Sequence, residues 1–162
     1  YIYDILLNFK KEFFEFYEWN LNDDIIHIRK IPVFKVRKNQ LYDFKNCNLI
    51  GTSLVNCTLK NVSILSCLGS YLNIGSSILE KTQFTDSNVK EMRLINNRLR
   101  NTTFNACNMS KLTLSDTRLR GVDLSTCDIS GMIFKPFDVV GCQVSANQAV
   151  EMIKNFGVIV KF

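Results

Sequence analysis

The chain has 162 residues, of which 46% are hydrophobic, and a formal charge of +5 from 20 Lys+Arg against 15 Asp+Glu. This length suits one domain with a real core. The mild basic excess is unlike that of a nucleic-acid-coating protein, and no apolar run approaches the ~18 residues of a membrane span.

The first 41 residues are predicted to form a cap made of a helix and a strand. Apolar residues recur at helical spacing within 1–21, and 25–36 is strand-like. The one histidine, His27, lies here and is expected to be structural or exposed rather than catalytic. We expect the helix to cover outward apolar residues of the next segment, which would otherwise form an exposed patch for a partner. These outward residues are Ile50, Val55, Leu65, Leu68, Tyr71 and Ile78.

From residue 44 to residue 134 every fifth residue is large and apolar, with Gly69 as the one exception. A period of five matches neither the helix nor the flat strand, so the chain must turn a corner every five residues. Fixed-period self-similarity of this kind indicates a solenoid. The column reads Phe44, Leu49, Leu54, Leu59, Ile64, Gly69, Ile74, Leu79, Phe84, Val89, Leu94, Leu99, Phe104, Met109, Leu114, Leu119, Leu124, Ile129 and Phe134.

All six cysteines fall two residues before a centre of this count, where a small side chain is predicted to point inward. Buried Cys behaves as a small hydrophobe, and the chain has no CxxC or Cys/His cluster with metal spacing. We therefore expect no metal or other cofactor, and reduced thiols that suit a cytoplasmic protein. Two pairs lie 20 residues apart, so stacked 20-residue coils would bring each pair within bridging distance: Cys47 with Cys67, and Cys107 with Cys127.

The stretches Cys47–Gly51 (CNLIG) and Val122–Thr126 (VDLST) closely match the motif A(D/N)LXX, and the sequence from Tyr42 to Phe134 resembles the pentapeptide-repeat family. The resemblance implies an all-β solenoid, namely a right-handed quadrilateral β-helix of about five coils with four repeats per coil. Turn-favouring residues at the corners agree with this: Asn46, Gly51, Asn56, Asn61, Asn96, Asn101, Gly121 and Gly131. The expected domains are the cap at 1–41, the β-helix at 42–135, and a C-terminal helix with an apolar tail at 136–162.

The C-terminal segment is predicted to contain a capping helix. Ser145 and Gln148 form a plausible capping box that opens a helix near 146–156, and Gly157 is placed to stop it. The tail that follows either packs over the last coil or forms a homodimer contact, the latter because the resemblance includes gyrase-interacting relatives that pair through their C-termini. Its candidate contact residues are Val158, Ile159, Val160 and Phe162.

A basic face is the strongest surface feature. Coils of 20 residues stack four arginines in two pairs, and like charges opposed across a ladder are unfavourable. Such pairs indicate either an anionic partner or a solvated face with Glu80 or Asp116 nearby. The candidate interaction residues are Lys60, Arg98, Arg100, Arg118 and Arg120.

The chain has no catalytic motif of the nucleotide-binding, zinc-protease or serine-hydrolase type, and its carboxylates are scattered. We therefore expect no enzyme, no catalytic residue and no membrane contact, but a rigid scaffold that binds a protein partner. The alternative implied by the resemblance is a protein that interacts with DNA gyrase or another topoisomerase, of the quinolone-resistance type. Such relatives are DNA-like in negative charge, whereas residues 42–135 carry 11 Lys+Arg against 7 Asp+Glu. A nucleic-acid partner is not expected, because interleaved exposed aromatics and a strong basic excess are missing.

Overall fold

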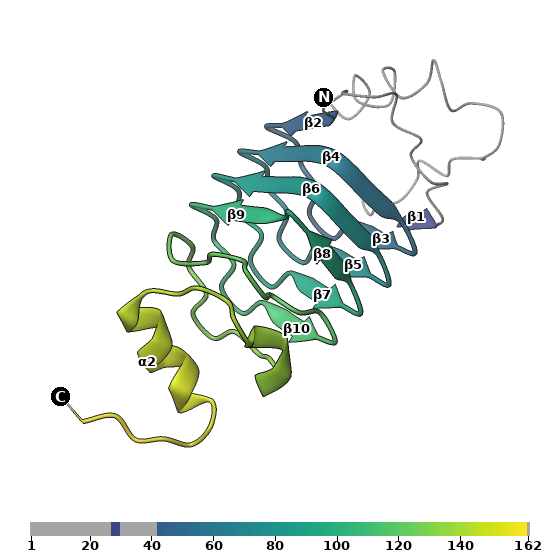
Figure 1. Ribbon diagram of the computed structural model, residues 1–162. Helices are drawn as coiled ribbons and strands as arrows, with labels where there is room; N and C mark the ends of the chain where they lie inside the picture. Colours follow the sequence, from purple (N-terminus) through teal and green to yellow (C-terminus); the bar gives the residue numbers. More distant parts are fainter. Residues whose placement is uncertain (1–26, 30–41, 162) are drawn as a thin grey trace, which may run out of the picture.

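The computed structural model describes residues 27–29 and 42–161. These residues form a parallel β-solenoid of about four turns that ends in helix α2 (Ala146–Lys154) (Figure 1). The predicted solenoid is thereby confirmed, with slightly fewer coils than the five expected. The predicted N-terminal helix lies outside the described residues, as do Phe162 and most of the predicted strand at 25–36.

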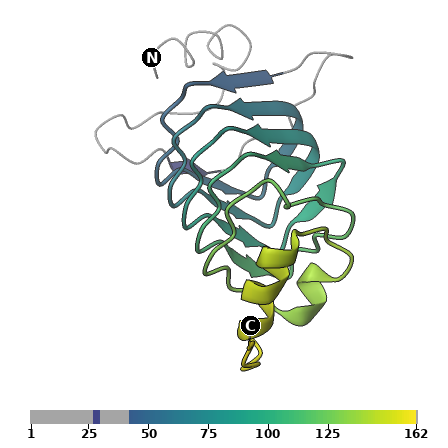
Figure 2. The same cartoon turned by 90° about the vertical axis from the view of Figure 1, so that its left-hand side faces the viewer.

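Two rows of parallel strands form the walls of the solenoid. In one row the strands pair in the order β1 (His27–Arg29), β3 (Ser53–Val55), β5 (Asn73–Gly75), β7 (Arg93–Ile95) and β10 (Thr113–Ser115). In the other the order is β2 (Tyr42–Lys45), β4 (Thr58–Leu65), β6 (Ile78–Thr85) and β8 (Arg98–Arg100), with β9 (Thr103–Asn105) also paired to β6. Figure 2 shows the same coils stacked from a second direction, with the helices at the C-terminal end.

The pairing register explains the period of five, because paired residues are 20 positions apart and each coil has four sides. Phe44 pairs with Ile64, Ile64 with Phe84, and Phe84 with Phe104. Strand β1 departs from this count, since His27 pairs with Ser53, 26 positions later. The predicted strand in the N-terminal segment is confirmed at His27–Arg29, which pairs 26 rather than 20 positions along the chain.

The central apolar column fills the interior. Phe84 is fully buried and stacks on Phe104, with ring centroids 4.9 Å apart and planes at 16°. Gly69 leaves no room for a large side chain, because a Cβ there would lie 3.1 Å from Val89 Cγ1. Neighbouring coils therefore close the gap in the column, whereas Leu68 points outward and is 53% exposed.

A ladder of polar side chains runs down one inner corner. The backbone N–H of Cys57 donates to Ser77 Oγ at 3.1 Å, that of Ser77 to Asn97 Oδ1 at 3.0 Å, and that of Asn97 to Thr117 Oγ1 at 2.9 Å. Each acceptor side chain also donates to a backbone carbonyl; Asn97 Nδ2, for example, donates to Ile74 O at 2.8 Å. The ladder thus gives buried backbone groups partners where the chain turns and strand pairing ends.

A 3₁₀-helix at Pro136–Val139 follows the predicted repeats and interrupts the regular coil. The carbonyl of Lys135 accepts from the Asp138 N–H at 3.0 Å, so it turns away from the coil above. The buried Asp138 carboxylate takes its place and accepts from the Asp116 N–H through Oδ2 at 3.1 Å. The last strand is β10, although isolated parallel bridges and backbone bonds continue to Gln143.

Helix α2 covers the last coil, and its predicted capping box between Ser145 and Gln148 is confirmed. Gln148 Nε2 donates to Leu124 O at 2.9 Å and to Cys127 O at 2.6 Å, which fills two acceptors at the open end of the solenoid. The helix ends at Lys154, earlier than expected, and Phe156 then packs edge-on against Phe134 at 5.8 Å.

Candidate partner-binding surface

The basic face is the side of the solenoid formed by β4, β6, β8 and residues 118–120. In each coil a central leucine points inward, so the residues on either side of it point outward. The pairs Lys60↔Glu80 and Glu80↔Arg100 stand one above the other, as do Ile78 and Arg98. The bond from the Asn97 N–H to Thr117 then places Arg118 and Arg120 on the coil below.

The upper part of the basic face is balanced in charge. Lys60 Nζ lies 2.9 Å from Glu80 Oε1 in a partly exposed ion pair. The pKa of Glu80 is lowered, first by the hydrogen bond from Lys60 and further by the charges of Lys60, Arg100 and Lys81. Lys60 is therefore engaged with Glu80 rather than free to meet a partner.

The lower part holds four exposed guanidinium groups, which we call the arginine array: Arg98, Arg100, Arg118 and Arg120. Within the described residues no carboxylate forms an ion pair with any of them. The two carboxylates that could neutralise them are used elsewhere, since Glu80 binds Lys60 and Asp116 binds Lys135 Nζ at 2.9 Å. The four guanidinium groups are thus exposed and outside any ion pair of the described residues, although the charge of Arg100 also acts on Glu80.

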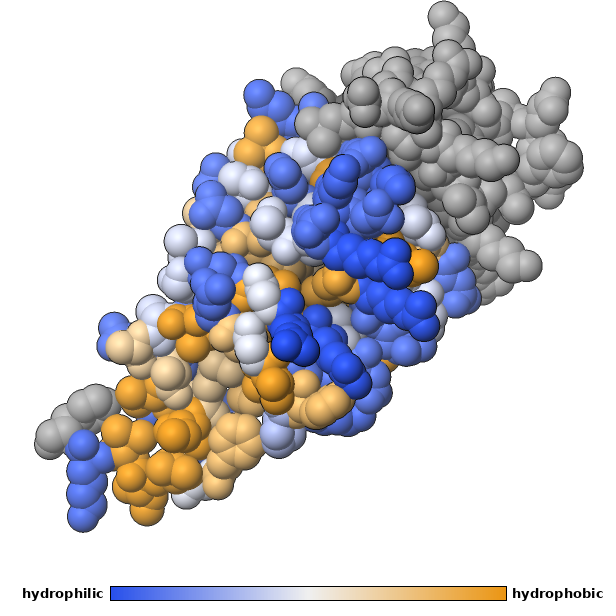
Figure 3. All heavy atoms as spheres, viewed as in Figure 1, coloured by the Kyte–Doolittle hydropathy of each residue, from blue (hydrophilic) through white to orange (hydrophobic). Residues whose placement is uncertain are grey.

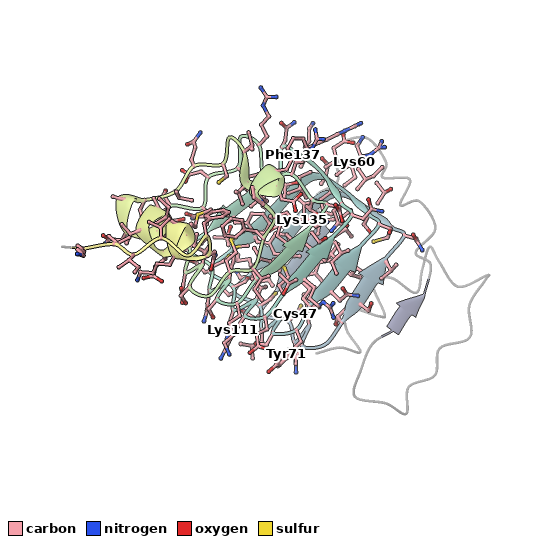
Figure 4. The ribbon with its side chains drawn as sticks, turned by 90° about the horizontal axis from the view of Figure 1, so that it is seen from below. Cys47, Lys60, Tyr71, Lys111, Lys135 and Phe137 are labelled. Carbon is pink, nitrogen blue, oxygen red and sulfur yellow. The ribbon has the colours of Figure 1, made fainter. Side chains whose placement is uncertain are left out.

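Arg118 is held in place by an aromatic ring. Its guanidinium carbon lies 4.3 Å from the centroid of Phe137, whose side chain is 61% exposed. A cation above a ring face is attracted by about 0.5–1 kcal/mol at an exposed site. Figure 4 shows Phe137 and Lys60 on the same side of the molecule, with Tyr71 and Lys111 on the opposite side. The array therefore occupies one face and is bordered by an exposed aromatic residue.

Many large apolar side chains of the last 30 residues are exposed, and Figure 3 shows an orange area at the C-terminal end of the molecule. We call them the C-terminal apolar cluster: Ile133, Phe137, Val140, Ile153, Phe156, Val158 and Ile159. Of the candidate contact residues, Ile159 is 84% exposed, Val158 is 46% exposed and Val160 is partly buried. The members before residue 158 were not predicted from the sequence. An apolar residue at an outward position of the repeat, such as Ile133, is the pattern that could have indicated them.

A metal site and a membrane-spanning helix were also sought in the described part of the chain. No group of three or more His, Cys, Asp or Glu side chains there could hold a metal ion. The helices of this part are too short or too polar to cross a membrane. Of the early outward residues, Ile50, Leu68 and Tyr71 are exposed.

Residues 93–125 match the family model "Pentapeptide repeats (8 copies)". This stretch is a run of pentapeptide repeats. The resemblance predicted from the sequence is confirmed there, over β7 to β10 and the two coils that hold the arginine array. A comparison with curated proteins gives no match.

Solved structures of pentapeptide-repeat proteins match the chain at low identity. One is a trypsin-treated form of QnrB1, a plasmid-mediated fluoroquinolone resistance protein, at 14% identity and a TM-score of 0.22, covering 85% of this chain and 99% of that one. Another is Rfr23 from the cyanobacterium Cyanothece 51142, at 12% identity and a TM-score of 0.20, covering 65% of this chain and 86% of that one.

Proposed function

We propose that the protein is a non-enzymatic scaffold that binds an acidic surface of a protein partner through the arginine array. The observation that carries this proposal is that four exposed guanidinium groups stand together on two consecutive coils, and none of them forms an ion pair with a carboxylate of the described residues. Mutual repulsion of like charges opposes this arrangement. A partner that supplies carboxylates removes the repulsion and forms paired, charge-assisted hydrogen bonds with the guanidinium forks.

The surroundings of the array favour a protein over a nucleic acid. Arg118 stacks on the exposed Phe137, and Val140, 60% exposed, follows shortly after. Arginine and aromatic residues beside apolar surface are enriched in protein interfaces. Residues 42–161 carry 13 Lys+Arg against 9 Asp+Glu, an excess of four, which is small for phosphate-backbone binding.

The same charge argues against the gyrase alternative. QnrB1 is a fluoroquinolone resistance protein, and the resemblance links such proteins to topoisomerases through a DNA-like negative surface. The described repeats here present positive charge instead. A cleft that accepts DNA repels such a surface, so gyrase remains the alternative partner and is not the one proposed.

Reversing the charge of two stacked arginines, Arg98→Glu with Arg118→Glu, is expected to weaken capture of the partner at least tenfold, because two opposite charges become like charges. A tenfold change corresponds to about 1.4 kcal/mol. The measurement is quantitative mass spectrometry of proteins retained from a lysate of the source cells, followed by titration of the purified candidate against both proteins.

The matched control is Lys90→Glu with Lys111→Glu, which makes the same change in net charge away from the array. Lys90 lies half a coil from Arg100, on the opposite side, and Figure 4 shows Lys111 on that side as well. The control is expected to retain the partner. Equal loss in both variants, or retention in both, contradicts binding through the arginine array.

We further propose that the part of the C-terminal apolar cluster at Ile153, Phe156, Val158 and Ile159 is a homodimer contact. Its charged neighbours Glu151 and Lys154 form an ion pair with each other at 2.6 Å, so these two side chains add no net charge to a contact between two copies. Apolar surface of this kind is typical of contacts between copies of one chain.

Placing a charge in the cluster, Ile159→Glu, is expected to convert a dimer into a monomer of 18.7 kDa. Ile159 is 84% exposed, so the substitution leaves the fold intact while a carboxylate buried at the contact would lack a partner. Light scattering after size exclusion measures the mass, and Ile50→Glu, at an exposed apolar residue of an early coil, is the control. A wild-type protein that stays monomeric at tens of micromolar rules out the contact.

A further inference from the structure

Two consecutive coils are not joined by backbone hydrogen bonds along the side that carries the arginine array. No such bond links residues 98–105 to residues 118–125, all of which the structure describes. Just before this stretch the Asn96 N–H donates to Ser115 O at 2.8 Å, and just after it the Asp128 N–H donates to the coil above at 2.9 Å. We call the unpaired stretch, 98–105 facing 118–125, the seam.

Both coils at the seam are paired on their other edges. Strand β8 pairs with β6 above it, and β8 and β9 are the last strands of their row (Figure 1). Below the seam the Leu119 N–H donates to Asp138 O at 2.7 Å, and the Gly121 N–H donates to Gly141 O at 2.9 Å. The seam is therefore a local break between two paired stacks of coils and not the end of the solenoid.

The sequence accounts for one bond that is missing at the seam. In the two coils above it, the carbonyl of a central leucine accepts from a threonine hydroxyl of the coil below. The equivalent residue below Leu99 is Val122, which has no hydroxyl to donate to the Leu99 carbonyl. The bonds in the coils above are Thr82 Oγ1 to Leu59 O at 3.1 Å and Thr102 Oγ1 to Leu79 O at 3.0 Å.

Leu99 is the central residue of the seam and has backbone groups that face it. Strand β8 bonds to the coil above through its neighbour, since the Arg98 N–H donates to Ser77 O at 2.9 Å. Successive residues of a strand direct their N–H and C=O to opposite edges, so those of Leu99 face the seam and have no backbone partner within the described residues. Leu99 is also partly exposed, whereas Leu79 and Leu119 above and below it are fully buried.

The arginine array borders this edge on both sides. Two of its members flank Leu99 in the chain and the other two flank Leu119, and all four are exposed. Positions two apart in an extended chain are about 6.6 Å apart. A partner strand with carboxylates at alternate positions repeats at this same distance, so its carboxylates meet the arginines while the side chain between them meets Leu99.

We propose that the seam binds an extended acidic segment of the protein partner as an added β-strand, with Asp or Glu at alternate positions. This inference rests on the function proposed above and names the form of the partner. Its backbone bonds to the N–H and C=O of Leu99, and its carboxylates bond to the guanidinium groups. A helix uses its backbone groups internally and a nucleic acid has no peptide groups, so neither supplies these partners.

The test is binding of three labelled synthetic peptides to the purified full-length protein, measured by fluorescence anisotropy. In the first peptide glutamate alternates with valine. The second has the same sequence with every peptide nitrogen methylated, so it keeps the charge and loses the backbone donors. The third groups the same glutamates and valines into two blocks. We expect the second and third to bind about tenfold more weakly than the first, which corresponds to the loss of one or two hydrogen bonds.

Hydrogen exchange followed by NMR locates the bound peptide. In the free protein the Leu99 amide is expected to exchange faster than the Leu79 amide, because Leu79 lies in β6 between two paired strands. The first peptide is expected to slow exchange at Leu99 about tenfold and to leave Leu79 unchanged. Binding through charge alone leaves the exchange rate of Leu99 as it is.

Val122→Thr supplies the hydroxyl that the seam lacks. Threonine there can donate to Leu99 O as Thr102 donates to Leu79 O, which removes one acceptor from the peptide while all four arginines stay in place. We expect it to weaken the first peptide roughly fivefold, the effect of about one hydrogen bond. Val62→Thr, at a buried position of the same column in β4, is the matched control and is expected to have no effect. Circular dichroism confirms that both variants are folded.

Equal binding of the three peptides without slower exchange at Leu99 overturns the added strand, and it leaves the arginine array as a surface that binds through its side chains. Absence of binding of the first peptide at about 1 mM also overturns it. The lysate capture with the charge-reversed arginines then decides separately whether the array binds a protein at all.

Discussion

Replacing Phe84 with alanine is expected to lower the free energy of unfolding by about 3–5 kcal/mol. Phe84 is fully buried in the third coil of the central column, and its ring stacks on Phe104 at 4.9 Å. The substitution removes the buried ring, opens a cavity between coils and deletes an aromatic pair that contributes about 0.5–1.5 kcal/mol beyond burial. Urea unfolding followed by circular dichroism measures the change.

Phe137→Ala is the matched control, because it removes the same side chain from a position that is 61% exposed. We expect it to change the unfolding free energy by less than about 1 kcal/mol, chiefly through the lost contact with Arg118. Similar losses at the two positions would contradict the packed column.

Asn97→Leu is expected to be comparably severe, at roughly 2–6 kcal/mol, for a different reason. Asn97 is buried, accepts from the Ser77 N–H and donates to Ile74 O, so leucine leaves two backbone groups without these partners. Each unsatisfied buried group costs about 1–3 kcal/mol. The same unfolding measurement applies.

Asn97→Thr distinguishes lost hydrogen bonds from altered packing. Threonine occurs at this position of the next coil, where Thr117 accepts from the Asn97 N–H and donates to Leu94 O at 3.2 Å. We expect this variant to retain most of the stability that leucine loses. If leucine and threonine destabilise equally, the ladder does not act through its hydrogen bonds.

The apolar period predicts the solenoid because burial of one residue in five is repeated in every coil. Leu79, Phe84, Val89 and Leu94 form the four inward centres of one coil, and all are fully buried. The small positions are equally clear, since five of the six cysteines are buried. The periodic pattern of side-chain size and polarity is therefore sufficient to predict which residues form the core.

Only some of the corner residues can be recognised from the sequence by their type. Asn and Gly mark eight of them, and all eight have positive φ, as expected. The same left-handed conformation is imposed on Tyr71, Lys81 and Glu91, with φ of 62°, 52° and 58°. Left-handed backbone disfavours such residues by roughly 1–2 kcal/mol each, so here closure of the coil and its hydrogen bonds overrides the local preference.

The state of charge of the basic face could not be predicted from the sequence. The 20-residue spacing places Lys60, Glu80 and Asp116 near the arginines, but it does not predict which basic side chain forms an ion pair with each carboxylate. The structure pairs Glu80 with Lys60 and Asp116 with Lys135, and this choice leaves the arginine array unneutralised within the described residues. Side-chain length and rotamer, which no pattern encodes, decide the outcome.

The 20-residue register also determines how such a protein can change in length. Each coil contacts only the coils above and below it, so stability is close to a sum over neighbouring coils. Inserting or deleting one whole coil keeps every column in phase and moves the two ends by one strand spacing, about 4.8 Å. Inserting a single residue turns every later side chain off its column. The length of the solenoid can therefore change only in steps of whole coils. Such steps change the distance between its N-terminal end and the C-terminal apolar cluster while both ends keep their sequences.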